Sequence, residues 1–165
     1  MFRTFFISLS FFFFLSPLFA DCNFKTGKYI DELSNPSYLK KIDIEIPKSA
    51  SYNKNILNIY ASKKNNISKN LKKKFYANVV VHYSFGICEY KSRIRQHGHQ
   101  KDHILLNSTG NVLRSLDVEL ITGNIMGIVN FKLLLPKTRR GKNEILASLI
   151  LKKLGFISPE TFDVI

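Results

Sequence analysis

The chain has 165 residues, with 25 Lys or Arg against 12 Asp or Glu, so its formal net charge is +13 at pH 7. This length fits one domain with a buried core, and the charge favours anionic partners such as nucleic acid, phosphates or lipid headgroups. The lysines occur in runs without interleaved aromatic residues, which argues against a dedicated nucleic-acid surface. The sequence lacks a CxxC pair and a Walker-type glycine-rich loop, so it gives no support to thioredoxin-like or P-loop chemistry.

Residues 1–20 have the pattern of a cleaved secretory signal peptide. Arg3 precedes a Phe-rich apolar run that Pro17 interrupts, and the small residue Ala20 marks the expected cleavage site. The run is too short for a comfortable membrane span, so we expect no transmembrane span after cleavage. The mature chain, residues 21–165, is predicted to be a single β-rich α+β domain with a net charge of +12, secreted or periplasmic.

The sequence contains two cysteines, Cys22 and Cys88. In an exported chain an even number of cysteines is typical of a disulfide. Cys22 lies near the start of the mature chain, where termini fray. Both a disulfide and two separate thiols are therefore kept as interpretations.

Strand patterns recur along the chain, as alternation of apolar and polar residues or as β-branched runs. They cover residues 42–47, 55–62, 74–86, 88–98, 115–124 and 129–136. Residues 62–74 are predicted to form a basic loop, and Gly86 marks a turn between two strands. The order predicts a mostly antiparallel sheet.

One clear helix is predicted over residues 143–154. Leu146, Leu149 and Ile150 recur at helical spacing, and Gly155 supplies a stop signal. This apolar stripe predicts that the helix packs on the sheet and holds the core. The fold class is therefore α+β, a mostly antiparallel β-sheet with one C-terminal helix packed on it.

The stretch "SRIRQHGHQKDHI" contains three of the four histidines. His97, His99 and His103 suggest a metal site, because imidazole is a common zinc and copper ligand. Strand alternation instead places Arg93 and Arg95 on the face of His97, which disfavours a dication.

The same stretch also suits an anion. The guanidinium groups of Arg93 and Arg95 suit phosphate or carboxylate, and Gly98 would let the backbone approach a ligand. Lys101 follows directly. A solvated hairpin tip that binds nothing is the third interpretation.

The order "RIRQHG", "SLDVEL", "FKLLLP" and "NEILASLILKKLGFISPETFDVI" resembles the front part of the CotH (spore coat protein H) family of atypical protein kinases, over residues 88–165. The glycine of "RIRQHG" follows the second arginine only after Gln-His, and "SLDVEL" lacks the lysine of the family pattern. The resemblance implies the N-terminal lobe of a kinase-like fold, with ATP and Mg or Mn as cofactors. Arg95 and Gly98 match its Arg-Gly element, whereas Lys101 and Arg114 are added as phosphate-side candidates from charge and position.

Three functions follow from these patterns. The first is an exported CotH-like kinase fragment, a nucleotide- and phosphate-binding front portion without catalytic acids and inactive alone. In that family the catalytic acids lie beyond the helix, so the domain is expected to be incomplete at its C-terminus and no catalytic residue is assigned. The second is a non-enzymatic binding module for an anionic ligand, and the third is a histidine-based metal-binding protein.

Overall fold

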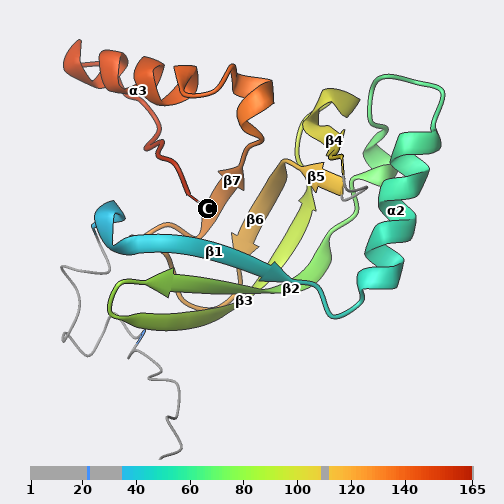
Figure 1. The fold of residues 1–165 in the computed structure, drawn as a ribbon, viewed down its shortest axis with the longest axis horizontal. Coiled ribbons are helices and arrows are strands. Elements are labelled where there is room, and N and C mark those ends of the chain that lie inside the picture. The colour runs from blue at the N-terminus through green and yellow to red at the C-terminus, as the bar shows by residue number, and fades with distance from the viewer. Residues whose placement is uncertain (1–21, 23–34, 109–111, 165) are drawn as a thin grey trace, which may run out of the picture.

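The computed structural model describes Cys22 and residues 35–108 and 112–164. The predicted signal peptide, residues 1–20, lies outside the described residues. Two α-helices and seven strands make up the described part (Figure 1). The strands are β1 (Leu39–Glu45), β2 (Phe75–Tyr83), β3 (Gly86–Gln96), β4 (Ile104–Leu106), β5 (Val112–Arg114), β6 (Leu116–Leu120) and β7 (Asn130–Leu133), and the helices are α2 (Ser49–Ala61) and α3 (Asn143–Lys153).

Five of the strands form one antiparallel sheet in the order β1-β2-β3-β6-β7, and β4 and β5 form a separate two-stranded ribbon. The α+β fold class and the mostly antiparallel sheet are therefore confirmed. Five of the predicted strand segments coincide with β1, β2, β3, β6 and β7. The β4–β5 ribbon has no counterpart among the predicted elements.

The core lies on one face of the sheet because alternate side chains of each strand point to the same side. On β2 this face carries Val79 and Val81, on β3 Tyr90 and Ile94, and on β6 Val118, all of them buried. The alternate residues of β3, Glu89 through Arg95, are exposed on the opposite, outer face. The strand pattern in the sequence thus separates a core face from a charged face.

The prediction of a strand over residues 55–62 is wrong, because this segment belongs to α2. The buried residues Tyr52, Ile56 and Ile59 follow one another at helical spacing, and all three join the core. The Tyr52 ring packs edge-on against Phe75 with centroids 5.1 Å apart. The predicted strand segment begins at Asn55 and leaves out Tyr52, and without Tyr52 the helical spacing of the buried residues is not apparent.

The predicted helix is confirmed as α3, but its predicted packing on the sheet is wrong. Leu146, Leu149 and Ile150 are all exposed, and within α3, every residue of which is described, only Ser148 is buried. Figure 1 shows α3 at the periphery, away from the sheet. Within the described residues it is α2 that supplies helical side chains to the core.

Residues 159–164 return from α3 towards the sheet without regular secondary structure (Figure 1). Phe162 and Val164 are partly buried against the core cluster. This segment therefore contacts the apolar side of the sheet and forms one wall of a cavity described below.

Cys22 and Cys88 form a disulfide with a Cα–Cα distance of 5.7 Å. Cys88 is fully buried on the core face of β3. The alternative of two separate thiols is thereby excluded. The bond ties the start of the predicted mature chain to the centre of the sheet.

Candidate anion-binding site

The outer face of β3 and β6 carries an ordered set of charges. Antiparallel register places Arg95 opposite Asp117 and Arg93 opposite Glu119. Opposite charges at such positions interact directly, because side chains of paired residues lie on the same face of the sheet. The register therefore places two cations beside two acids, and of these two facing positions only Arg95 and Asp117 form an ion pair among the described residues.

Asp117 orients the guanidinium of Arg95. The Arg95 Nε donates to Asp117 Oδ2 at 2.9 Å, and His97 Nδ1 lies 2.7 Å from Asp117 Oδ1. Within the described residues the contact with Asp117 is the one hydrogen bond or ion pair that the Arg95 side chain makes. The terminal N–H groups of Arg95 thus remain available to a ligand, while its Nε fixes the plane of the fork.

The same contacts keep Asp117 ionised. Partial burial raises the pKa of Asp117, but the hydrogen bonds with His97 and Arg95, with the positive charge nearby, outweigh it and hold the pKa below its usual value. Asp117 is therefore a fixed negative group under ordinary conditions. Its role in this arrangement is to position Arg95 and His97.

Arg93 and Glu119 are held by different neighbours. Glu119 accepts a 2.6 Å hydrogen bond from Lys74 Nζ, which lowers the pKa of the carboxyl group. The Arg93 guanidinium lies over the Tyr76 ring, 5.5 Å from its centroid, and its pKa is raised by the contact with that side chain. Tyr76 of β2 thus holds the Arg93 side chain, which lies on the outer face of β3 as Arg95 does.

A depression of about 710 Å³ lies at the end of β3 and next to β6 and β7, and we call it the basic groove. Arg95, Lys132, Lys69 and Lys72 line it, against the acids Asp117 and Asp102. These charges leave a net excess of two cations with every imidazole neutral. His97, Gly98, His99, Gln100 and His103 complete the lining.

Lys132 lines both the basic groove and a neighbouring cavity, which is described next. It lies opposite Asp117 in the register of β6 and β7, and its side chain is exposed. Within the described part of the chain no ion pair of Lys132 is recorded, since Asp117 is bonded to Arg95 and His97. Lys132 therefore adds an uncompensated positive charge beside the Arg95 fork.

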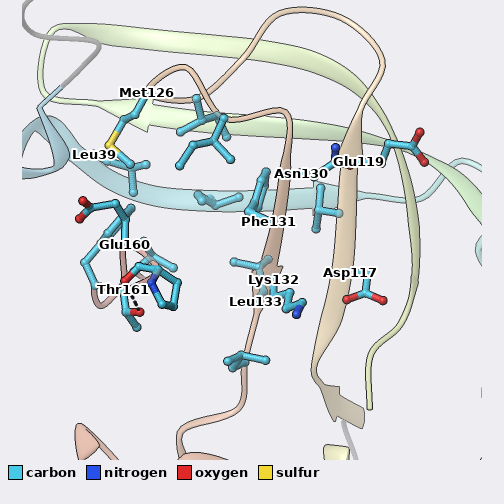
Figure 2. A pocket seen from close by; sticks show the side chains of 18 of the residues that line it. Leu39, Asp117, Glu119, Met126, Asn130, Phe131, Lys132, Leu133, Glu160 and Thr161 are labelled. Carbon is cyan, nitrogen blue, oxygen red and sulfur yellow. Dashed lines mark hydrogen bonds between the residues drawn. The ribbon is translucent and has the colours of Figure 1, made fainter. Parts of the chain in front are cut away.

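A cavity of about 670 Å³ adjoins the basic groove and shares Arg95, Asp117 and Lys132 with it. Figure 2 shows Leu39, Met126, Glu160 and Thr161 on one side of the β7 trace and Asp117 and Glu119 on the other. The part of its wall near the core is mainly apolar. Its apolar lining includes Leu39, Ile125, Met126, Phe131, Leu133 and Phe162.

The three candidate metal ligands lie close together but have other contacts. The rings of His97 and His103 meet edge to face with centroids 5.2 Å apart, and His103 Nδ1 lies 3.1 Å from Ser115 Oγ. His99 Nδ1 lies 3.3 Å from Lys72 Nζ. Among the described residues no group of three His, Cys, Asp or Glu side chains is arranged to hold a metal ion.

Gly98 has a packing reason for its lack of a side chain. Its φ is +88°, and a Cβ at this position would lie 2.1 Å from Cδ2 of His103. The glycine lets the chain cross over the His103 ring directly after β3. Gly98 also lines the basic groove. The sequence predicted that its backbone approaches a ligand closely, whereas in the structure the backbone approaches the His103 ring.

Lys101 and Arg114 are used away from the Arg95 fork. Lys101 Nζ donates to the main-chain carbonyls of Tyr60 and Ser62 at the end of α2. The Arg114 guanidinium lies over the Tyr52 ring, 4.3 Å from its centroid, and burial lowers its pKa. Of the proposed phosphate-side residues, Arg95 and Gly98 line the basic groove. Arg93 lines only the neighbouring cavity, together with Arg95, and Lys101 and Arg114 line neither hollow.

Sequence reasoning missed Lys69, Lys72 and Lys132 as site residues. The first two belong to the basic loop predicted over residues 62–74, whose lysines carry no positional signal of their own. Lys132 lies in the apolar run of β7, which was interpreted as a buried strand, but β7 is an edge strand with Asn130 and Lys132 exposed. The alternation Phe131, Lys132, Leu133 is the signal that could have located this lysine on the outer face.

No protein-family model matches the chain, and searches of curated proteins and of solved structures likewise give no match. Within the described residues no helix has the length and apolar character needed to cross a membrane.

Proposed function

We propose that this chain is an exported nucleotide-binding module, the front portion of a CotH-like kinase. Its basic groove would hold the phosphate groups of a nucleotide. Its apolar-walled cavity would receive the base. Mg or Mn would accompany the nucleotide, as the resemblance implies, and the chain alone would not transfer the phosphoryl group.

The observation that carries this proposal is the Arg95–Asp117 pair. A single bond from Nε to Asp117 orients the guanidinium and leaves its terminal N–H groups for an anion. Planar forks of this kind suit phosphate oxygens, because two N–H groups can donate in parallel. Lys132 and the lysines of the basic groove supply further positive charge around the same point.

The neighbouring cavity favours a nucleotide over a bare phosphate. It shares three residues with the basic groove and presents apolar side chains such as Phe131, Met126 and Phe162. Ligand sites of this size commonly combine an apolar wall with a few polar groups that fix orientation. We expect the anionic end of a nucleotide to contact Arg95 and Lys132 on the outer face, and its aromatic body to reach the apolar side chains around the edge strand β7.

Export is supported by the disulfide. Cys22 lies two residues after the predicted cleavage site at Ala20, and its bond to Cys88 suits an oxidising compartment. The signal pattern of residues 1–20 and the disulfide point to the same location, secreted or periplasmic. N-terminal sequencing of exported protein should therefore find Asp21 first, and an intact Met1 would contradict export with cleavage.

The second candidate function is a non-enzymatic module that recognises an anionic ligand without contacting a base. The abundance of cations around Arg95 favours it as much as a nucleotide site. The two functions differ in whether the apolar-walled cavity contributes to binding.

Titration calorimetry with three ligands separates them. ATP with magnesium, tripolyphosphate and adenosine should be compared at low salt. A nucleotide site binds ATP more tightly than tripolyphosphate and loses affinity as salt rises, since screening weakens the charge contacts. Equal binding of ATP and tripolyphosphate would favour the second function, and binding of neither would contradict both.

A further inference from the structure

Helix α3 has its polar side against the protein and its apolar side towards solvent. Ser148, its one buried residue, lies with its Oγ 3.0 Å from Oγ1 of Thr161, and its carbonyl accepts a 3.0 Å hydrogen bond from Ser158 Oγ. Polar side chains therefore make these contacts between α3 and the following segment, and the Lys152–Glu160 ion pair adds to them. This is the reverse of a core-packing helix, whose apolar stripe faces inward.

Helix α3 and the residues that follow it expose seven large apolar side chains within twelve residues, and we call this group the α3 apolar face. Leu149 is 53% exposed, Leu154 is 65% exposed and Ile157 is fully exposed at 104%. The full set is Leu146, Leu149, Ile150, Leu151, Leu154, Phe156 and Ile157. A patch of this kind marks an interaction site, since scattered single residues would need no explanation.

Cations flank the α3 apolar face at both ends. Lys137 and Arg140 precede the helix, and Lys153 lies in its last turn, where it also complements the helix dipole. Within the described residues none of these three has a recorded ion pair, whereas Lys142 pairs with Asp163 and Lys152 with Glu160. The apolar face is therefore accompanied by unneutralised positive charge.

We propose that the α3 apolar face binds the surface of an anionic lipid bilayer. Leucine, isoleucine and phenylalanine would enter the boundary between headgroups and acyl chains, and Lys137, Arg140 and Lys153 would contact the anionic headgroups. The binding is peripheral, because α3 is too short to cross the hydrocarbon region.

Charge complementarity selects this occupant. A second copy would bring two α3 faces and two sets of flanking cations together, on chains that each carry a net charge of +13. An anionic bilayer has the opposite charge. Figure 1 shows α3 at the periphery of the described part of the chain.

The proposal is independent of the nucleotide site, because none of the residues of the α3 apolar face lines the basic groove. Co-sedimentation of the full chain should be measured with vesicles of phosphatidylglycerol and phosphatidylcholine, and with phosphatidylcholine alone. We expect binding to the anionic vesicles that weakens as salt rises. The double variant Leu149→Gln with Leu154→Gln should bind them roughly tenfold more weakly.

The matched control replaces two exposed apolar residues of α2, Leu57 and Tyr60, with glutamine. This variant should bind anionic vesicles with the affinity of the wild-type chain. Because both double variants contain residues 1–20, any vesicle binding by those residues is the same in the two and cancels in their comparison. Circular dichroism establishes that both variants are folded. Equal binding by the two variants, or absence of binding to anionic vesicles, would overturn the proposal. Self-association that only the α3 variant loses would assign the face to a second copy instead.

Discussion

Arg95 on β3 and Asp117 on β6 lie directly opposite each other, and the Arg95 Nε donates a 2.9 Å hydrogen bond to Asp117 Oδ2. The second carboxylate oxygen of Asp117 contacts His97. The Asp117 carboxylate therefore positions two side chains that line the basic groove, Arg95 and His97. The same arrangement predicts how stability responds to acid.

Asp117→Asn should reduce the loss of stability in acid. The folded-state pKa of Asp117 is below its usual value, so its stabilising contribution is complete above about pH 4 and is lost as pH falls through the folded pKa. The free energy of unfolding, measured with denaturant between about pH 6 and about pH 2.5, should fall more steeply in the wild type than in the variant. Identical slopes would show that Asp117 has no shifted pKa.

Ile59→Ala should destabilise the protein far more than Leu149→Ala. Ile59 on α2 is fully buried, so its truncation leaves a cavity and should cost about 2–5 kcal/mol. Leu149 on α3 is 53% exposed, and its truncation should cost less than about 1 kcal/mol. Urea unfolding of both variants measures the difference. A large loss for Leu149→Ala would place α3 against the core, as the sequence pattern predicted.

Reduction of the Cys22–Cys88 disulfide should lower the free energy of unfolding by about 4 kcal/mol. The bond closes a loop with a sequence separation of 66, which limits the entropy of the unfolded chain. Denaturant curves with and without dithiothreitol give the value. The double variant Cys22→Ala with Cys88→Ala is the control, and its curve should not respond to the reductant.

The purified chain should not transfer phosphate on its own. Phosphoryl transfer needs carboxylates that hold magnesium and orient the nucleophile. On the outer face Asp117 is bonded to Arg95 and His97, and Glu119 is bonded to Lys74. Incubation with labelled ATP, magnesium or manganese and a generic Ser/Thr substrate should give no label above a heat-killed control. Label transfer would mean that these acids, or others in the chain, are catalytic.

The five strands of the sheet could be predicted because each shows alternation or an apolar or β-branched run, whereas β4 and β5 are too short to show either pattern. On β3 the sequence indicated that Arg93 and Arg95 share a face with His97. In the structure both Arg95 and His97 contact Asp117, which agrees with this. What the sequence could not supply was the partner strand. The Arg95–Asp117 and Asp117–Lys132 pairs depend on the register between strands far apart in the chain.

The two helices show a second limit of sequence reasoning. In α2 the buried residues Tyr52, Ile56 and Ile59 recur at helical spacing, but the predicted strand segment begins at Asn55 and leaves out the first of them. In α3 the apolar stripe was recognised, but periodicity says only that a face is apolar. It does not say whether the domain or something outside it covers that face.

The most direct test of the nucleotide site compares Arg95→Gln with Lys91→Gln. Both residues are exposed cations on the outer face of β3, but only Arg95 lines the basic groove and the cavity. Titration calorimetry with ATP and magnesium should show the dissociation constant rising about tenfold or more for Arg95→Gln. For Lys91→Gln the constant should change by no more than about twofold, since only screened long-range charge is lost. Equal weakening in the two variants would contradict a site built around Arg95 and reduce its role to general surface charge.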